Sequence, residues 1–457
     1  MHVDPAPAPP AALDDSTPWY KTLNRYHWFV LIVCSLGWLF DTMDQQLFNI
    51  ARRPAMRALV DAEKVTEYSG FATTIFLIGW GAGGIGFGVL GDLIGRAKSM
   101  VFTILLYSLF TGLSAFSWDF WSFGLFRFLT GLGVGGQFAV GVSLVAEEMP
   151  DRARPFALGT LQALSAVGNI TAALSGIVLA YLVRAGWIQE SWRIMFMIGA
   201  VPALLAVPVM GRLREPERWL KLAEQKSMRE RIGAYGAELF REPRWLKNAI
   251  VGLILASSGI IGLWAIGFFS IDLQRAIFRT RLEGQGLSPG DVTFNEDLWA
   301  SMTSVTLNLG AFFGIYAFSR VSHRLGRRPT FAIAFVLALL STAFVFWKFD
   351  SIGDIFWMIP IMGFCQLALF GGYAIYFPEL FPTRLRTSGT SFCYNGARFV
   401  AAAAPSALGL MNQHFKDVYG DPILAFRYAG IVMCAIFLVG LAVLPFAPET
   451  KGQPLPE

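Results

Sequence analysis

Four polar side chains that could bind a proton or a substrate lie close together near the start of the chain. Asp41, Asp44, Gln45 and Asn49 stand at spacings of i, i+3, i+4 and i+8, so a helix would bring them onto one face. They end an apolar run that begins near Trp28. An ionisable residue at bilayer depth costs about 2.5 to 3.5 kcal/mol, so such residues usually face a water-filled path or a partner. We interpret the stretch as a transport site; a polar helix end at the membrane surface is the simpler alternative.

The composition indicates a membrane protein. Of the 457 residues, 54% are hydrophobic and only 15% are charged, whereas a soluble domain carries about a quarter charged residues. The net charge of +5 would suit nucleic acid in a soluble chain, but here the basic residues lie between apolar spans, where the positive-inside rule accounts for them. We therefore expect a lipid bilayer as a partner, no nucleic acid, and a multi-pass location in the cell (inner or plasma) membrane.

Apolar segments of membrane-spanning length recur about twelve times. They centre on residues 28–50, 69–90, 100–116, 121–145, 155–182, 192–210, 248–271, 298–318, 330–347, 355–377, 387–411 and 422–445. The distribution of Lys and Arg places both termini in the cytoplasm and two long segments, 52–67 and 272–297, outside. The second of these contains the turn signal Gly-Leu-Ser-Pro-Gly.

The two halves of the chain repeat the same short motifs. Residues 147–154 (EEMPDRAR) and 379–386 (ELFPTRLR) share Glu, Pro and two Arg, about 232 positions apart (382 minus 150). Gly95-Arg96 recurs as Gly326-Arg327, and Pro216-Glu217 as Pro448-Glu449, at nearly the same offset. Six spans are followed by a second set of six that repeats them in parallel. Two such halves around a site at mid-membrane describe an alternating-access transporter.

From these features we predict an all-α membrane protein with twelve transmembrane helices in two six-helix pseudo-repeats. The expected divisions are a disordered cytoplasmic tail at 1–26, a first half at 27–213, a cytoplasmic linker at 214–247, a second half at 248–446 and a cytoplasmic tail at 447–457.

These motifs resemble those of the major facilitator superfamily, and the resemblance covers nearly the whole chain after the N-terminal tail. Residues 88–98 (GVLGDLIGRAK) are similar to the superfamily's G-x-x-x-D-x-x-G-R-x-[RK] signature. Asp92 can cap a neighbouring helix and pair with a basic residue, which would latch the cytoplasmic side. The second copy has His323 in place of Asp92, so the carboxylate latch is expected only in the first half.

Further motifs resemble the branch shared by sugar porters and proton-coupled organic acid carriers. Residues 216–220 (PERWL) and 448–452 (PETKG) are similar to two signatures of this branch, and 127–135 (RFLTGLGVG) is similar to its R-x-x-x-G-x-G-x-G pattern. Glycines at this spacing let a second helix approach closely, which would suit a rocking interface. The residues expected to form the cytoplasmic gate are Asp92, Arg96, Glu147, Arg152, Glu379 and Arg384; ordinary solvated charge pairs are the alternative.

The resemblance also implies how a proton would be carried. In the related families an Asp in a Phe-Asp-Thr setting works with an Arg of the fourth span, and Phe40-Asp41-Thr42 and Arg127 occupy those positions. We expect Asp41 to carry the proton and Arg127 to modulate it, although Arg127 could instead be a structural tie between helices. Asp44 lies outside the family's pattern, so which of the two Asp residues titrates stays open.

The substrate class is less sharply indicated. Arg398 lies in an Ala-rich span, where a buried cation calls for an anion partner such as a substrate carboxylate; a helix carbonyl could satisfy it instead. Gln162 and Asn169 match positions where sugar porters hold hydroxyls, but span 7 lacks their paired Gln and Ala374 replaces their Trp. The other expected substrate-binding residues are Gln45, Asn308, Gln366, Tyr373, Tyr394 and Asn395.

The sequence thus favours proton-coupled symport of a small organic anion, aromatic or short-chain, by rocking of two halves. A sugar or polyol symporter is the alternative, and a drug exporter or a non-transporting membrane sensor is less favoured. We find no nucleotide-binding loop, metal cluster or nucleophile with a base. We therefore expect no enzyme activity, no metal, no cofactor other than the proton gradient as energy source, and function as a monomer.

Overall fold

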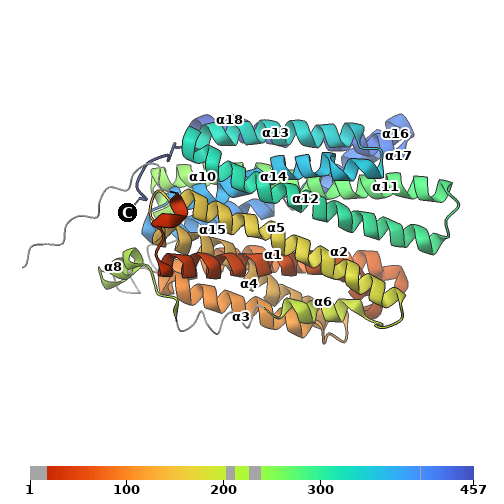
Figure 1. The fold of residues 1–457 in the computed structure, drawn as a ribbon, viewed down its shortest axis with the longest axis horizontal. Coiled ribbons are helices and arrows are strands. Elements are labelled where there is room, and N and C mark those ends of the chain that lie inside the picture. The colour runs from red at the N-terminus through yellow and green to blue at the C-terminus, as the bar shows by residue number, and fades with distance from the viewer. Residues whose placement is uncertain (1–17, 202–211, 226–237, 402, 457) are drawn as a thin grey trace, which may run out of the picture.

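The computed structural model describes residues 18–201, 212–225, 238–401 and 403–456, and these parts are almost entirely helical (Figure 1). In the N-terminal part the helices are α1 (Arg25–Leu59), α2 (Val65–Ile94), α3 (Arg96–Ser114), α4 (Phe120–Glu148), α5 (Arg154–Arg184), α6 (Ser191–Gly199) and α8 (Glu217–Gln225). In the C-terminal part they are α10 (Pro243–Ile261), α11 (Phe268–Gly284), α12 (Pro289–Leu325), α13 (Arg327–Lys348), α14 (Met358–Glu379), α15 (Arg386–Ala401), α16 (Ala404–Tyr419), α17 (Pro422–Met433) and α18 (Ile436–Val443).

The helices confirm an all-α, multi-pass membrane architecture. Within the described residues, ten helical segments are long and apolar enough to cross a bilayer. Of the two other expected spans, 192–210 continues into residues outside the described part. The other, 387–411, is divided between α15 and α16 on either side of residue 402.

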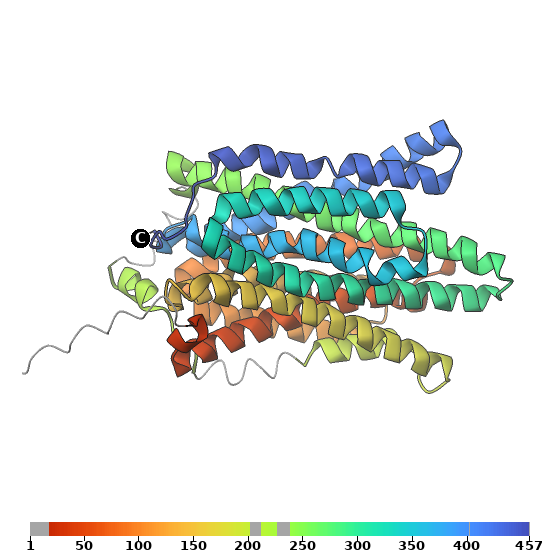
Figure 2. The same ribbon diagram turned by 45° about the horizontal axis from the view of Figure 1, so that its top comes forward.

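The long helices lie side by side in one bundle (Figures 1 and 2). We call the end that carries the C-terminus and the turns at Gly95 and Gly326 the base, and the opposite end the mouth. The N-terminal and C-terminal helices meet chiefly where α5 packs on α12 and α2 packs on α15. These two seams position the groups described below.

Three segments outside the expected spans contain helix. The tail expected to be disordered through residue 26 includes a 3-10 helix, Trp19–Thr22, and the Trp19 ring stacks on Phe156 at 5.8 Å. The long segment 52–67 is mostly helix, because α1 continues to Leu59. Segment 272–297 likewise consists of the ends of α11 and α12, and the chain turns between them at Gly286, as its turn signal predicted.

The glycines of α4 allow close helix contact, chiefly with α2 and α3 of the N-terminal part. A Cβ at Gly135 would lie 2.1 Å from the Trp80 carbonyl oxygen on α2, and one at Gly133 would lie 2.6 Å from the Tyr107 nitrogen on α3. The Gly135 carbonyl also accepts from Asn395 of α15 in the C-terminal part at 3.2 Å. The rocking interface itself stays a prediction. These contacts hold α4 rigidly between its neighbours.

Candidate transport site

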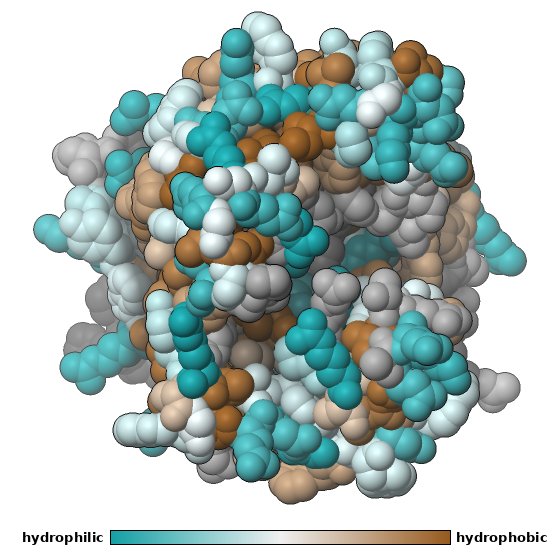
Figure 3. Space-filling view, turned by 90° about the vertical axis from the view of Figure 1, so that its right-hand side faces the viewer, coloured by the Kyte–Doolittle hydropathy of each residue, from teal (hydrophilic) through white to brown (hydrophobic). Residues whose placement is uncertain are grey.

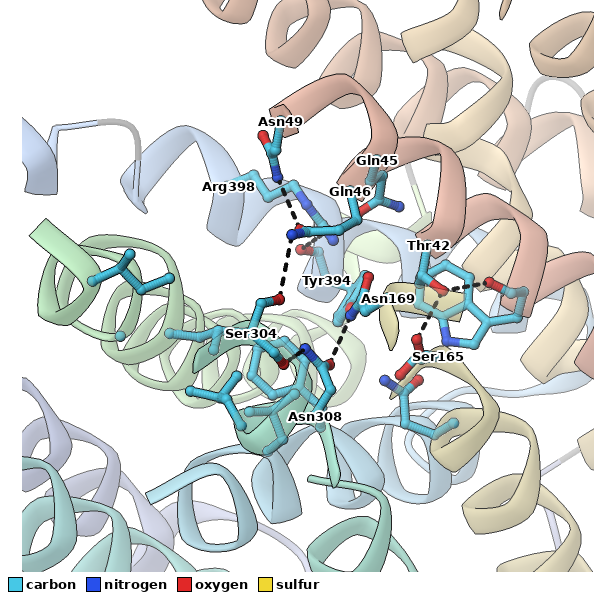
Figure 4. A pocket seen from close by; sticks show the side chains of 18 residues that line it. Thr42, Gln45, Gln46, Asn49, Ser165, Asn169, Ser304, Asn308, Tyr394 and Arg398 are labelled. Carbon is cyan, nitrogen blue, oxygen red and sulfur yellow. Dashed lines mark hydrogen bonds between the residues drawn. The ribbon is translucent and has the colours of Figure 1, made fainter. Parts of the chain in front are cut away.

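A cavity of about 70 Å³ lies between α1 and α5 of the N-terminal part and α12, α14 and α15 of the C-terminal part (Figure 4). Seen from the mouth, the molecule is hollowed near its centre (Figure 3). The cavity is lined by Trp38, Thr42, Gln45, Gln46, Asn49, Gln162, Ser165, Asn169, Leu263, Gly267, Ile271, Ser304, Leu307, Asn308, Leu367, Phe370, Tyr394 and Arg398. Eleven of these eighteen residues carry hydroxyl, amide or guanidinium groups, so the wall offers many hydrogen-bonding groups to a ligand.

Six of the nine residues expected to bind substrate line this cavity: Gln45, Gln162, Asn169, Asn308, Tyr394 and Arg398. The other three do not line it and have structural contacts instead. Tyr373 donates to the Leu255 carbonyl at 2.6 Å, Gln366 donates to Thr342 at 2.7 Å, and Asn395 donates to the Gly135 carbonyl at 3.2 Å.

Sequence reasoning missed several lining residues, among them Trp38, Gln46, Ser165, Ser304 and Phe370. Some signals were available. Ser304 stands one turn before Asn308, and Trp38 stands one turn before Asp41. Phe370 gave no signal, because an apolar residue in a span is ordinarily core or lipid contact.

Hydrogen bonds connect the two halves across the cavity. Asn169 donates to the Asn308 side-chain oxygen at 3.0 Å. Nearer the mouth, Gln46 donates to the Ser304 hydroxyl at 3.4 Å. Both bonds join uncharged groups, so they hold the halves together weakly compared with the charged contacts at the base.

Arg398 is the cationic side chain among the residues that line the cavity. Its Nη1 donates to the Tyr394 carbonyl and to the Asn395 side-chain oxygen, both at 3.0 Å. Its guanidinium lies over the rings of Trp80 and Tyr394, at 3.9 and 4.2 Å from their centroids. No carboxylate among the described residues forms an ion pair with it. The charge is therefore held in place by aromatic faces and neutral oxygens.

Three polar atoms of the lining are buried without a hydrogen-bond partner among the described residues: the Nε1 donor of Trp38, the Oε1 acceptor of Gln162 and the Nε donor of Arg398. Leaving such groups unpaired costs about 1 to 3 kcal/mol each. A bound ligand with oxygen acceptors could take the two donors. The cavity is thus built to gain polar contacts on binding.

Asp41 lies directly behind this lining. The side chain is fully buried, and its Oδ2 accepts a hydrogen bond from Gln45 at 3.2 Å. Its Oδ1 has no partner among the described residues. Gln45 itself lines the cavity, so the Gln45 side chain connects Asp41 to the cavity.

Arg127 does not pair with Asp41, contrary to the pairing expected from the family pattern. Its Nη1 lies 3.8 Å from Oδ2 of Asp44, and both side chains are fully buried. Other atoms of the Arg127 guanidinium donate to Ser114 at 2.8 Å and to Thr130 at 3.0 Å. The opposite charge that acts on Asp41 is instead Arg398. One turn of α1 separates the two carboxylates, and it directs them to different partners.

At the base, charged contacts hold the two parts of the chain together. Asp92 accepts hydrogen bonds from the Thr387 and Ser388 backbone amides at 3.2 and 2.8 Å, so it caps the first turn of α15 as predicted. It also pairs with Arg96 at 3.1 Å. Arg96 in turn donates to the Thr383 carbonyl at 2.6 Å.

Glu147 is shared between two arginines at the base. It lies 3.0 Å from Arg96 and 2.6 Å from Arg386, and all three side chains are fully buried. Arg386 was not among the expected gate residues, although its motif was recognised. Charges this deeply buried are retained only when paired, so the triad ties α4 of the N-terminal part to α15.

The second half repeats part of this arrangement. Glu379 pairs with Arg327 at 2.6 Å, as Glu147 pairs with Arg96, but its third contact is Thr450 of the C-terminal tail. Arg384 pairs with Glu238 at 2.6 Å. Arg152 lies half-exposed in the turn between α4 and α5. The expected gate is therefore a cross-half contact at Glu147 and a contact within the C-terminal part at Glu379.

The glycine turns of the two repeats are closed in the same way. Gly95 and Gly326 have φ of 113° and 101°, which glycine adopts readily. The helix after each turn is capped by a glutamate: Glu215 accepts from the Ala97 and Lys98 amides, and Glu449 accepts from the Arg327 and Arg328 amides. The sequence matched Glu217 to Glu449, but the residue that caps the helix as Glu449 does is Glu215, two positions earlier.

Family models match both parts of the chain. The model for sugar (and other) transporters matches residues 39–235, and the Major Facilitator Superfamily model matches residues 283–457. The chain belongs to the major facilitator superfamily. It is a secondary transporter of small molecules rather than an enzyme.

Two curated relatives of similar length are named after an organic acid or its lactone. The chain is 26% identical to a probable 4-methylmuconolactone transporter of Cupriavidus pinatubonensis, over 95% of this chain and 93% of the relative. It is 28% identical to a cis,cis-muconate transport protein of Acinetobacter baylyi, over 85% and 87% of the two chains.

The same fold is found among solved structures. The proton:xylose symporter XylE, bound to 6-bromo-6-deoxy-D-glucose, superposes with a TM-score of 0.72 at 18% identity, over 94% of this chain and 98% of that one. At this identity the likeness establishes the architecture only.

Proposed function

We propose that this transporter is a proton-coupled symporter of a small organic anion, aromatic or short-chain. The observation that carries the proposal is Arg398, a cation that lines the cavity without a carboxylate partner among the described residues. A substrate carboxylate would supply that partner and could also accept from the unpaired Trp38 and Arg398 donors. The names of the two relatives support the same class of substrate.

Asp41 is the proposed proton carrier. A carboxyl group that is fully buried, with one oxygen unpaired, is more stable in its neutral form, since burial disfavours the charged form. Substrate bound at Arg398 withdraws the positive charge that favours ionised Asp41. Binding of the anion and protonation of Asp41 therefore promote each other, which is the coupling that symport needs.

The base is the proposed cytoplasmic side, with both termini there. In this state its charged contacts join the halves, while the mouth is joined by neutral hydrogen bonds. Alternating access would break the Asp92 and Glu147 contacts and close the mouth. Cavity and gate lie within one chain, which supports transport by a monomer.

A sugar or polyol symporter is the second candidate. It is favoured by the amides of Gln162, Asn169 and Asn308 along one side of the cavity, because amides hold hydroxyl groups well. The unpartnered Arg398 argues for the anion, since a neutral sugar would leave its charge unmatched.

The test is uptake into proteoliposomes under an imposed pH gradient, acidic on the mouth side. Radiolabelled benzoate, cis,cis-muconate and propionate would be compared with glucose and xylose. We expect saturable accumulation of a carboxylate and its loss in Asp41→Asn, with counterflow exchange retained. Saturable hexose uptake without any response to the carboxylates would refute the proposed substrate class.

A further inference from the structure

A cluster of buried polar groups lies inside the N-terminal part, outside the substrate cavity. Its members are Asp41 and Asp44 on α1, Tyr107, Thr111 and Ser114 on α3, and Arg127 on α4, and each is fully buried. None of the six lines the cavity. Burial of so many polar groups within membrane spans is costly, which marks the cluster as functional.

The order of contacts along α1 and α3 gives the cluster a direction. Both helices run from base to mouth. Nearest the mouth, Ser114 accepts from Arg127; one turn below, Thr111 donates to Asp44 at 2.8 Å. Tyr107 is a further turn below Thr111, about 6 Å along the axis, and Asp41 is about 4.5 Å below Asp44. Tyr107 thus lies at the level of Asp41.

Several polar atoms of the cluster are buried and unpaired. Within the described part of the chain, the Tyr107 hydroxyl, Asp41 Oδ1, Asp44 Oδ2 and Arg127 Nη1 are all buried without a hydrogen-bond partner. Both carboxylates and the adjacent Ser108 side chain act on the Tyr107 hydroxyl. The Asp44 and Arg127 atoms are 3.8 Å apart, a separation that a bridging water commonly spans. Apart from each other, the charged groups that act on the two carboxylates are, among the described residues, Arg127 and Arg398.

We propose that the Tyr107 hydroxyl relays the transported proton between Asp44 and Asp41, along a buried route separate from the substrate cavity. The proposal rests on Asp41 as the proton carrier of the proposed symport. A proton leaves the Asp44 carboxyl and reaches a lone pair of the Tyr107 oxygen, directly or through one water. The original hydroxyl proton passes to the Asp41 carboxylate. Tyr107 ends neutral, Asp44 ends as carboxylate and Asp41 ends as carboxylic acid.

This route separates the two transported species. The proton reaches Asp41 from Asp44 through Tyr107 of α3, and the substrate enters through the cavity. They meet at Gln45, which donates to Asp41 and lines the cavity. Proton supply therefore does not require an empty cavity, and an anion already bound at Arg398 can draw the proton onto Asp41.

The test compares two kinds of uptake in proteoliposomes that carry the full chain, with benzoate or cis,cis-muconate as the probe, whichever the wild type accumulates. In Tyr107→Phe we expect the initial rate of proton-driven uptake to fall about tenfold or more, since proton transfer by a positioned side chain contributes at least that factor. Counterflow exchange at equal pH should be unchanged. Tyr373→Phe is the matched control, because Tyr373 is equally buried but bonded to the Leu255 carbonyl.

Two further variants separate the possible failures. Asp44→Asn should also slow proton-driven uptake and spare counterflow, and proton-driven uptake at the wild-type rate in this variant would overturn the relay even if Tyr107→Phe failed to fold. An unaltered rate in Tyr107→Phe would likewise overturn it. If Asp41→Asn keeps proton-driven accumulation, the proposed symport mechanism itself is wrong.

Discussion

The interiors of the two repeats differ sharply, although their helix arrangement, glycine turns and helix caps match. With the offset of 231 to 232 positions that relates Gly95 to Gly326 and Glu147 to Glu379, Tyr107, Ser114 and Arg127 correspond to Ala338, Val345 and Ile359. All six are buried. The N-terminal interior therefore holds charge, and the corresponding positions of the C-terminal interior hold apolar packing.

This difference divides the work between the halves. Proposed proton chemistry lies in the N-terminal part, at Asp41 and Asp44, while the proposed anion site is Arg398 on α15 of the C-terminal part. At the base the asymmetry recurs, because Asp92 is replaced by His323 and only the first repeat caps a helix of the other half. A duplicated frame has thus kept its turns and caps while its interior has diverged.

The largest expected effect on stability comes from replacing Arg127 with Ile, the residue at the corresponding position of the second repeat. Arg127→Ile leaves Asp44 buried without its cation, so we expect a loss of about 3 to 5 kcal/mol in the free energy of unfolding. Adding Asp44→Leu should restore most of the stability without restoring proton-driven uptake, since well-packed apolar residues often replace a buried pair at no cost. Thermal unfolding in detergent measures both. A fully stable Arg127→Ile single variant would contradict the account.

Next in size is the removal of the proposed anion site. In Arg398→Gln we expect the affinity for the transported carboxylate to fall roughly 10- to 100-fold, because a hydrogen bond to a charged group is worth about 1.5 to 3 kcal/mol. Equilibrium binding of the radiolabelled carboxylate measures this. Arg320→Gln, an exposed arginine of α12, is the control. Equal affinities for both variants would assign Arg398 a structural role.

A smaller effect should appear equally in both repeats at the base. Glu215→Ala and Glu449→Ala each remove a cap from the helix that follows a glycine turn. We expect each to lower the free energy of unfolding by about 0.5 to 2 kcal/mol. A loss in only one variant would show that the two caps, although similar in geometry, contribute differently to the free energy of unfolding.

The smallest effect concerns pH at the Glu449 cap. Burial alone would raise the pKa of Glu449, but hydrogen bonds from the Arg327, Arg328 and Lys451 amides and the charge of Arg327 hold it below the usual range. A lowered folded-state pKa stabilises the protein fully above the unfolded pKa of about 4.3, and this contribution disappears as the pH falls through the folded-state value. Glu449→Ala should therefore lose part of its stability difference from wild type between pH 6 and pH 3, roughly the window this shift allows. A constant difference would exclude ionised Glu449 as the cap.

The sequence predicted the spans and turns of the molecule well, because hydropathy and turn motifs are local properties of the sequence. Apolar runs located the spans, and the repeated Gly-Arg turns were recognisable from their spacing. The Asp92 cap was expected from the resemblance to the superfamily's signature. Five of the six predicted cavity residues carry an amide or a cation, and such groups are rare in membrane helices and stand out; the sixth is Tyr394.

The pairing of side chains could not be predicted in the same way. Asp41 and Asp44 share a helix, and whether Arg127 lies nearer one or the other depends on how α4 rotates against α1. The Thr111 and Ser114 contacts that fix this belong to α3, which carried no recognised motif. Similarly, Glu215 and Glu217 differ by two positions in a linker, and only the fold decides which reaches the α3 amides.

Proton movement with the substrate tests the central claim most directly. Proteoliposomes that contain a pH-sensitive dye and start at equal pH would receive the transported carboxylate on the mouth side. We predict acidification of the lumen in step with carboxylate uptake for the wild type, and no such acidification for Asp41→Asn. Carboxylate accumulation by the wild type with no movement of protons would contradict the account.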